Sequence, residues 1–120
     1  MTETYVTTAF SLGMLGAVKR ASIDVEEVCL CEVKSAVQCG AAVRIGHQST
    51  ADVLGTLLGM ELTADRTPVQ IQPGSTAVIY VVQLLQRPQE GQVYTRDEVR
   101  DLVRKGLLKA YKVTVRADPV

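Results

Sequence analysis

This chain of 120 residues lacks any apolar run that approaches the roughly 20 residues a membrane-spanning helix needs. Its first ten residues, Met1–Phe10, contain Glu3 and several threonines instead of the basic start and apolar stretch of a signal peptide. We therefore expect a protein of the cytoplasm that has no membrane partner. Asparagine is also absent, which would suit a hot environment, although three methionines and three cysteines weaken that argument.

The chain has no surplus of charge of either sign, because thirteen Lys and Arg residues balance thirteen Asp and Glu residues. A protein that coats long nucleic acid needs extra basic residues to neutralise phosphates, so this class is disfavoured. A compact anion in a local basic pocket is still allowed. Hydrophobic residues make up 47% of the chain, enough for a real core, and the length suits a single domain over residues 1–120.

Cysteine and histidine are scarce, which bears on metal binding. Three cysteines, Cys29, Cys31 and Cys39, cannot all pair within one chain. Zinc takes about four ligands, and one histidine with three cysteines at these spacings matches no usual zinc site. Cys29 and Cys31 lie two apart in a β-like run and point to one face. We interpret the cysteines as buried core thiols and expect neither a metal nor a cofactor.

Alternating and apolar patterns predict the strands. They cover residues 4–9, 25–33, 36–45, 68–71, 76–85 and 107–115, with a hairpin turn at Lys34 and Ser35 between the second and third. The run Ala77–Val82 is apolar on both faces, so its strand should be central in the sheet.

Capping signals predict three helices. A short one begins at Ser11, and a second begins at Ser49 or Thr50, carries a capping-box-like Asp52 and ends at Gly59. The third begins with a clean capping box, Thr95 with Glu98, and runs through Lys105 to Gly106. Together the elements predict an α+β fold, a single small domain with a mixed β-sheet and helices packed on it.

A first candidate site is the segment Gly46–Thr50, between a strand and a helix start. Backbone N–H groups at a helix start carry positive potential and bind phosphate readily, and the hydroxyls of Ser49 and Thr50 add donors. His47 beside them could exchange a proton with a phosphate ester, because imidazole titrates near neutral pH. The alternative is a surface or helix-capping histidine with no further role.

A second candidate site is Arg87–Gly91, directly after the central strand. An arginine at a strand end can hold two phosphate oxygens and stabilise the charge that grows on them, and Glu90 could orient His47 or deprotonate a hydroxyl. The alternative is a solvated loop with a surface ion pair. Gln83 interrupts the central strand, so its amide must find a partner, either a ligand base or ribose or a backbone group across the fold. Arg66, beside Asp65 in a turn, could be a second phosphate contact or an ordinary exposed charge.

Three segments together resemble the viral type III anti-CRISPR ring nuclease family, which also has cellular members. The segments are Thr7–Leu15, Ile45–Thr50 and Gln86–Gly91, and their order and spacing match over nearly the whole chain. The resemblance implies a homodimer that binds cyclic tetra-adenylate, the messenger of type III CRISPR defence. It also implies metal-independent cleavage of that ring into linear di-adenylate.

The same resemblance implies the roles of individual residues. The family's catalytic histidine, arginine and glutamate map onto His47, Arg87 and Glu90. The positions that match substrate-binding residues are Ser11, Ser49, Thr50, Gln83, Arg66, Thr8 and Gly46. Two residues depart from the family pattern, Thr8 where asparagine is frequent and Gly13 where a polar residue is usual, so ligand contacts in this loop should differ from those of the family.

Two other functions stay open from the sequence. The protein could sequester a cyclic oligoadenylate without cutting it, or it could be a small structural or transcription-associated viral dimer with no nucleotide ligand. The sequence does not say whether a virus or a cell uses the protein.

Overall fold

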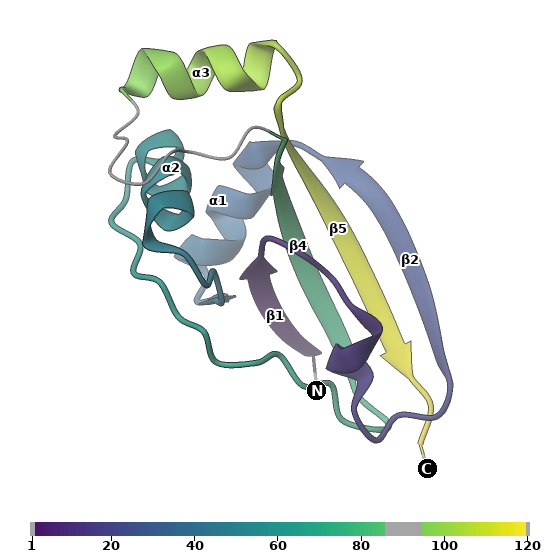
Figure 1. Cartoon of the computed structure of the whole chain (residues 1–120). Helices are drawn as coiled ribbons and strands as arrows, with labels where there is room; N and C mark the ends of the chain where they lie inside the picture. Colours follow the sequence, from purple (N-terminus) through teal and green to yellow (C-terminus); the bar gives the residue numbers. More distant parts are fainter. Residues whose placement is uncertain (1, 86–94, 120) are drawn as a thin grey trace.

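The computed structural model describes residues 2–85 and 95–119 of the chain. Within these residues, five strands, three α-helices and one 3-10 helix follow one another as a single α+β domain (Figure 1). Their order is β1 (Thr2–Thr7), η1 (Leu12–Leu15), β2 (Ala21–Val28), α1 (Leu30–Gln38), β3 (Ala42–Val43), α2 (Gln48–Leu58), β4 (Thr76–Leu84), α3 (Arg96–Arg104) and β5 (Leu108–Ala117).

The strands form one mixed sheet in the order β2-β5-β4-β1-β3. Strand β1 runs parallel to both β3 and β4, whereas β5 runs antiparallel to β4 and β2. Strand β4 is therefore the middle strand, which confirms the prediction from its apolar sequence. The predicted α+β class and mixed sheet are likewise confirmed.

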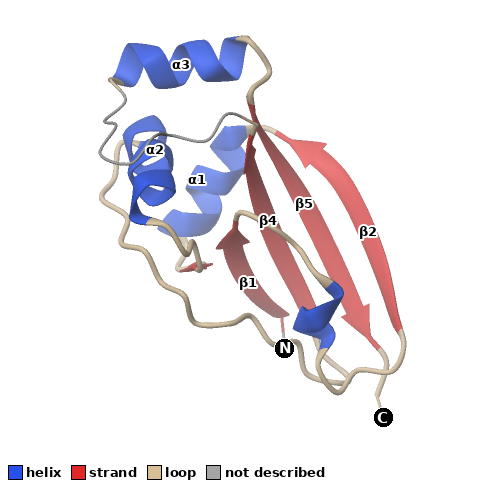
Figure 2. Ribbon diagram, in the orientation of Figure 1, coloured by secondary structure: helices blue, strands red, loops and turns tan. Residues whose placement is uncertain are grey.

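Two hydrophobic cores lie on opposite faces of this sheet. Helices α1, α2 and α3 cover one face near one end of the strands (Figure 2). Leu54 and Val99 of the helices belong to the same buried cluster as Val6 and Val82 of the sheet. On the other face, η1 and the long segment before β4 contribute partly buried and buried side chains. These are Phe10, Met14, Leu15, Val18, Val69 and Ile71, and they pack on Ile79, Val113 and Val115.

The prediction of a strand over residues 36–45 was wrong. Helix α1 (Leu30–Gln38) takes in the end of the predicted strand 25–33 and the first residues of the predicted strand 36–45. Lys34 and Ser35 lie inside this helix rather than in a hairpin turn, and only Ala42–Val43 forms strand β3. Val33 is fully buried, and Ala36 and Val37 pack beside it, which is the spacing of three and four that a helix produces. The predicted strand 68–71 is also wrong, because this segment forms no strand, although Val69 and Ile71 are buried.

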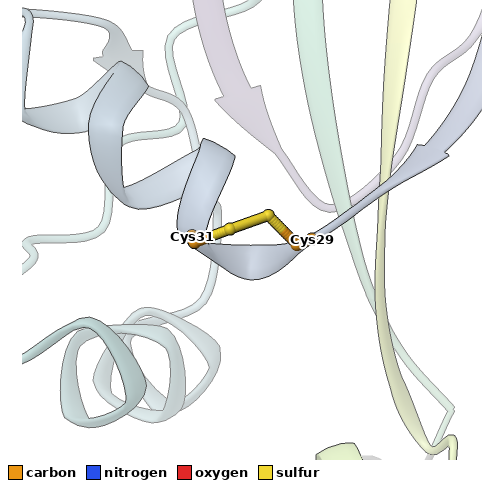
Figure 3. The surroundings of a disulfide bond; sticks show 2 residues. All are labelled: Cys29 and Cys31. Atoms are coloured by element: carbon orange, nitrogen blue, oxygen red, sulfur yellow. A yellow bond between two sulfur atoms is a disulfide. The ribbon is translucent and has the colours of Figure 1, made fainter.

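The interpretation of the cysteines as buried core thiols was also wrong. Cys29 and Cys31 form a disulfide where β2 passes into α1, and both residues are exposed (Figure 3). Cys39 is a free, exposed cysteine at the other end of α1. The reason is the helix: once the chain turns at Cys29, the two sulfurs lie on its solvent side instead of on a sheet face.

The helix ends were predicted with mixed success. Thr95 and Glu98 form the expected capping box at the start of α3, and Gly106 follows its end in the left-handed conformation. Gly59 ends α2, as predicted. The capping box at Ser49 and Asp52 is absent, because α2 begins one residue earlier with His47 as its N-cap. Asp52 instead accepts a hydrogen bond from the side chain of Gln48 (2.8 Å).

The two helix starts give a matched pair of variants. We expect Thr95→Ala to lower the free energy of unfolding by about 1 kcal/mol, because it removes the side-chain bond to the backbone N–H of Glu98. Ser49→Ala is the control, since α2 has no side-chain cap bond to lose. Urea denaturation monitored by circular dichroism measures both, and an equal loss in the two variants would contradict the assignment of the caps.

Candidate functional site

The carboxyl ends of three parallel strands meet at one edge of the sheet. Strands β3, β1 and β4 lie side by side and run in the same direction, so the chain leaves them at Arg44, Thr8 and Leu85. Ligands of sheets with parallel strands bind at such carboxyl ends. An open cleft of about 470 Å³ lies here. Its lining residues are Thr7, Thr8, Ala9, Met14, Arg44, Gly46, His47, Asp65, Arg66, Thr67, Pro68 and Val69.

His47 enters this cleft as the N-cap of α2. Its backbone is extended, its carbonyl accepts the first helical hydrogen bond from the N–H of Ala51 (3.0 Å), and its side chain makes no cap bond. The side chain is exposed. An imidazole that caps nothing is available to a ligand, and the adjacent helix start supplies positive potential.

Arg66 lies against the segment that carries His47. Its Nε donates a hydrogen bond to the carbonyl of Gly46 (2.9 Å), and a Cβ added to Gly46 would meet the Arg66 side chain at 3.7 Å. Residues from two distant segments therefore place a guanidinium and an imidazole in one cleft. Arg66 is exposed, so both interpretations of it, a phosphate contact and an ordinary exposed charge, stay open.

Arg44 and Asp65 complete the cleft, and Arg44 was not predicted from the sequence. Its Nη1 lies 2.6 Å from Oδ2 of Asp65. The backbone N–H of Asp65 donates to the carbonyl of Ile45 (2.9 Å), so both the backbone and the side chain of Asp65 are held by this strand end. With Arg44 and Arg66 against one carboxylate, the cleft has a net positive charge even with a neutral His47. An arginine that follows a short apolar run was the available signal.

The carboxyl group of Asp65 has a pKa below its ordinary value of 3.8. The largest cause of this lowered pKa is a hydrogen bond from the side chain of Thr67, followed by one from the backbone N–H of Thr67, which lies 2.9 Å from Oδ1. The hydrogen bond and charge of Arg44 add to it. A lowered pKa in the folded state means that the charged carboxylate stabilises the fold above about pH 4. This contribution is lost as the pH falls through the lowered pKa.

We therefore expect Asp65→Asn to flatten the acid side of the stability profile. Its Tm should fall less than that of the unchanged protein between about pH 6 and about pH 3. Asp101→Asn is the control away from the cleft, because a hydrogen bond from Lys105 lowers the pKa of Asp101 as well. Both variants should flatten the profile in thermal melts, and only Asp65→Asn should alter anion binding. An unchanged acid slope in Asp65→Asn would contradict this assignment.

A second hollow of about 380 Å³ adjoins the cleft, since Thr8 and Ala9 line both. Gln83 lines it from β4, together with Phe10, Tyr111 and the exposed Val25. Gln83 is exposed, so its amide needs no partner within the protein, contrary to the expectation from its apolar neighbours. Its position leaves it free to contact a ligand or a second chain.

The predicted site residues are thus only partly brought together. Thr8, Gly46, His47 and Arg66 line one cleft. Ser49 and Thr50 lie in the first turn of α2 and Ser11 is the N-cap of η1, so these three are near the cleft in sequence but do not line it. Arg87 and Glu90 lie outside the described residues, and their contact with His47 stays a prediction.

No group of three metal-ligating side chains that could hold an ion occurs in residues 2–85 and 95–119. In the same part of the chain, no helix has the length and apolar character to cross a bilayer.

The fold and the cleft define a class of small α+β proteins with a basic cleft where parallel strands end. The chain belongs to the STIV B116-like family, whose model matches residues 4–107. It is similar to B116 of Sulfolobus turreted icosahedral virus, with 28% identity and a TM-score of 0.76 over 92% of this chain and 97% of that chain. It is also 28% identical to ORF116, an uncharacterized protein of Acidianus filamentous virus 1, over 92 residues, which are 72% of this chain and 78% of the relative. Both relatives are viral proteins.

Proposed function

We propose that this protein is a metal-independent ring nuclease that binds cyclic tetra-adenylate and cleaves it to linear di-adenylate, switching off type III CRISPR signalling. One observation carries the proposal: His47, at the start of α2, shares a basic cleft with Arg66 and Arg44. The cleft offers a phosphodiester both positive charge and a proton-transfer group. The motifs that resemble the anti-CRISPR ring nucleases supply the choice of substrate.

RNA brings its own nucleophile, the ribose 2′-hydroxyl, so the protein must supply alignment, charge stabilisation and a proton for the departing 5′-oxygen. His47 acts as the general acid in this proposal, because its imidazole is exposed in the cleft and makes no hydrogen bond that caps the helix. Arg66 and Arg44 bind phosphate oxygens. Arg87 stabilises the charge on the pentacoordinate phosphorus, and Glu90 orients His47.

A ring of four equal nucleotides suits a two-fold homodimer, which presents equivalent sites to opposite phosphates. The apolar hollow beside the cleft supports such a dimer, because the side chain of Val25 is 63% exposed on it and Gln83 and Thr8 border it. A second copy on this face would cover Val25 and bring two clefts to one ring. Light scattering at about twice the chain mass of 13.0 kDa is the expected result.

The direct test is incubation of the pure protein with cyclic tetra-adenylate and EDTA, followed by chromatography of the products. We expect di-adenylate to accumulate over many turnovers. A ring that stays intact while the Tm of the protein rises would replace the proposal with sequestration, since a ligand that binds only the folded state stabilises it. An intact ring with an unchanged Tm would show that the protein neither cleaves nor binds cyclic tetra-adenylate.

A further inference from the structure

The disulfide between Cys29 and Cys31 lies on the surface, at the point where the edge strand β2 passes into helix α1 (Figure 3). The two Cα atoms are 5.2 Å apart, within the range that a disulfide spans, and both residues are exposed. None of the residues lining the cleft is a cysteine. This pair is therefore a feature that the proposed ring cleavage does not use.

A purely structural role explains this bond poorly. Disulfides stabilise proteins mainly by restricting the unfolded chain, and the effect grows with the length of the loop that is closed. Here the bonded residues are separated by 2 positions, so the bond restricts the unfolded chain very little. Reductants can also reach both exposed residues without unfolding of the protein.

The local backbone favours reactive sulfur. Cys29 is the N-cap of α1 and Cys31 lies in its first turn, where unpaired backbone N–H groups stabilise a thiolate. Cys39 lies at the opposite end of the same helix, so it is a free, exposed reference thiol within the same chain. Glu32, also in the first turn, acts against thiolate formation, and its side chain is only partly exposed.

We propose that Cys29 and Cys31 form a redox-active dithiol–disulfide centre that exchanges electrons with thiol reductants while the protein stays folded. In reduction, the thiolate of a dithiol attacks one sulfur of the pair and breaks the Cys29–Cys31 bond, which releases the other sulfur as a thiolate. The second thiol of the reductant then displaces the attached cysteine. The protein gains two electrons and two protons, and the reductant leaves as a disulfide.

The experiment uses the full chain with Cys39→Ser, equilibrated in mixtures of reduced and oxidised dithiothreitol, with free thiols trapped by a maleimide and counted by mass. We expect only the species with no free thiol and with two free thiols, a reversible transition between them, and an unchanged circular dichroism spectrum. A pair that stays reduced in excess oxidised dithiothreitol would overturn the proposal. So would a pair that opens only under denaturing conditions, which would make it a structural bond.

Single variants test the exchange step. In the Cys39→Ser background, Cys29→Ser and Cys31→Ser should each accumulate a mixed disulfide with oxidised glutathione, whereas the intact pair resolves it to the internal bond. The matched control is a separate variant that retains Cys39 and carries Cys29→Ser and Cys31→Ser together. At neutral pH the remaining thiol of each single variant, Cys29 or Cys31, should react with oxidised glutathione about threefold or more faster than Cys39 does in the control. Equal rates would remove the role of the helix start.

Cleavage of cyclic tetra-adenylate is read in the same variants. We expect it to be unchanged when Cys29 or Cys31 is replaced, because neither residue lines the cleft. The proposal of a redox centre and the proposal of ring cleavage are therefore tested independently.

Discussion

His47→Ala is expected to lower kcat for cleavage of cyclic tetra-adenylate by about 10²–10⁴-fold, the usual contribution of a positioned general acid. Its Kd should change little, because the arginines and the helix start that are proposed to bind phosphate are retained. The fold should also be retained, since the His47 side chain makes no cap bond and is exposed. Single-turnover cleavage and equilibrium binding, measured side by side, separate the two effects.

Gln70→Ala is the matched control for this variant. Gln70 is an exposed polar residue next to the segment that lines the cleft, but it is not among the lining residues, so its replacement should leave kcat unchanged. Added imidazole should restore part of the activity of His47→Ala, because the position is open to solvent. Full activity in His47→Ala would show that His47 is not the general acid.

Gly55→Ala is expected to destabilise the protein by about 1–3 kcal/mol, the range for overpacking a filled core. Alanine in a helix interior ordinarily adds about 0.5–1 kcal/mol of stability over glycine, so the expected sign is the reverse of that rule. The cause is space: a Cβ at Gly55 would lie 2.6 Å from the carbonyl oxygen of Met60, which is backbone. The backbone just beyond α2, at Met60, must therefore move to make room.

Gly46→Ala is the control for steric crowding, because a Cβ there meets only the flexible Arg66 side chain at 3.7 Å. Urea denaturation should show a clear loss for Gly55→Ala and a small change for Gly46→Ala. Binding of cyclic tetra-adenylate should weaken in Gly55→Ala as well, if the segment 60–67 shifts. If Gly55→Ala were more stable than the unchanged protein, the backbone at Met60 would be able to move away from the new Cβ without loss of folding free energy, and the prediction would be wrong.

Some parts of the fold follow from short stretches of sequence. Strand β4 was placed correctly because Ala77–Val82 is apolar on both faces, and only a central strand buries both. Helix α3 was placed correctly because the capping box at Thr95 acts within one turn. Helix α1 was missed because Cys29, Cys31 and Val33 alternate as in a strand, while Leu30, Val33 and Val37 repeat as in a helix. A run this short fits both periods.

The candidate site shows the same division. The segment Gly46–Thr50 could be identified from the sequence, because the residues that begin a helix are recognisable from their near neighbours in the chain. Its partners could not: Arg44 and Asp65 are 21 residues apart, and Arg66 reaches Gly46 from 20 residues away. Such contacts depend on which strands lie side by side, and no local pattern encodes that order.

The sequence by itself determined the fold class, the central strand, both ends of α3, the end of α2 at Gly59 and the presence of a histidine near a helix start. The tertiary structure alone decided that His47 shares a cleft with Arg44, Asp65 and Arg66, and that Cys29 and Cys31 meet at the surface as a disulfide. The physical reason is range. Hydrophobic periodicity and capping act within a few residues, whereas the cleft exists only because three parallel strands end at one edge of the sheet.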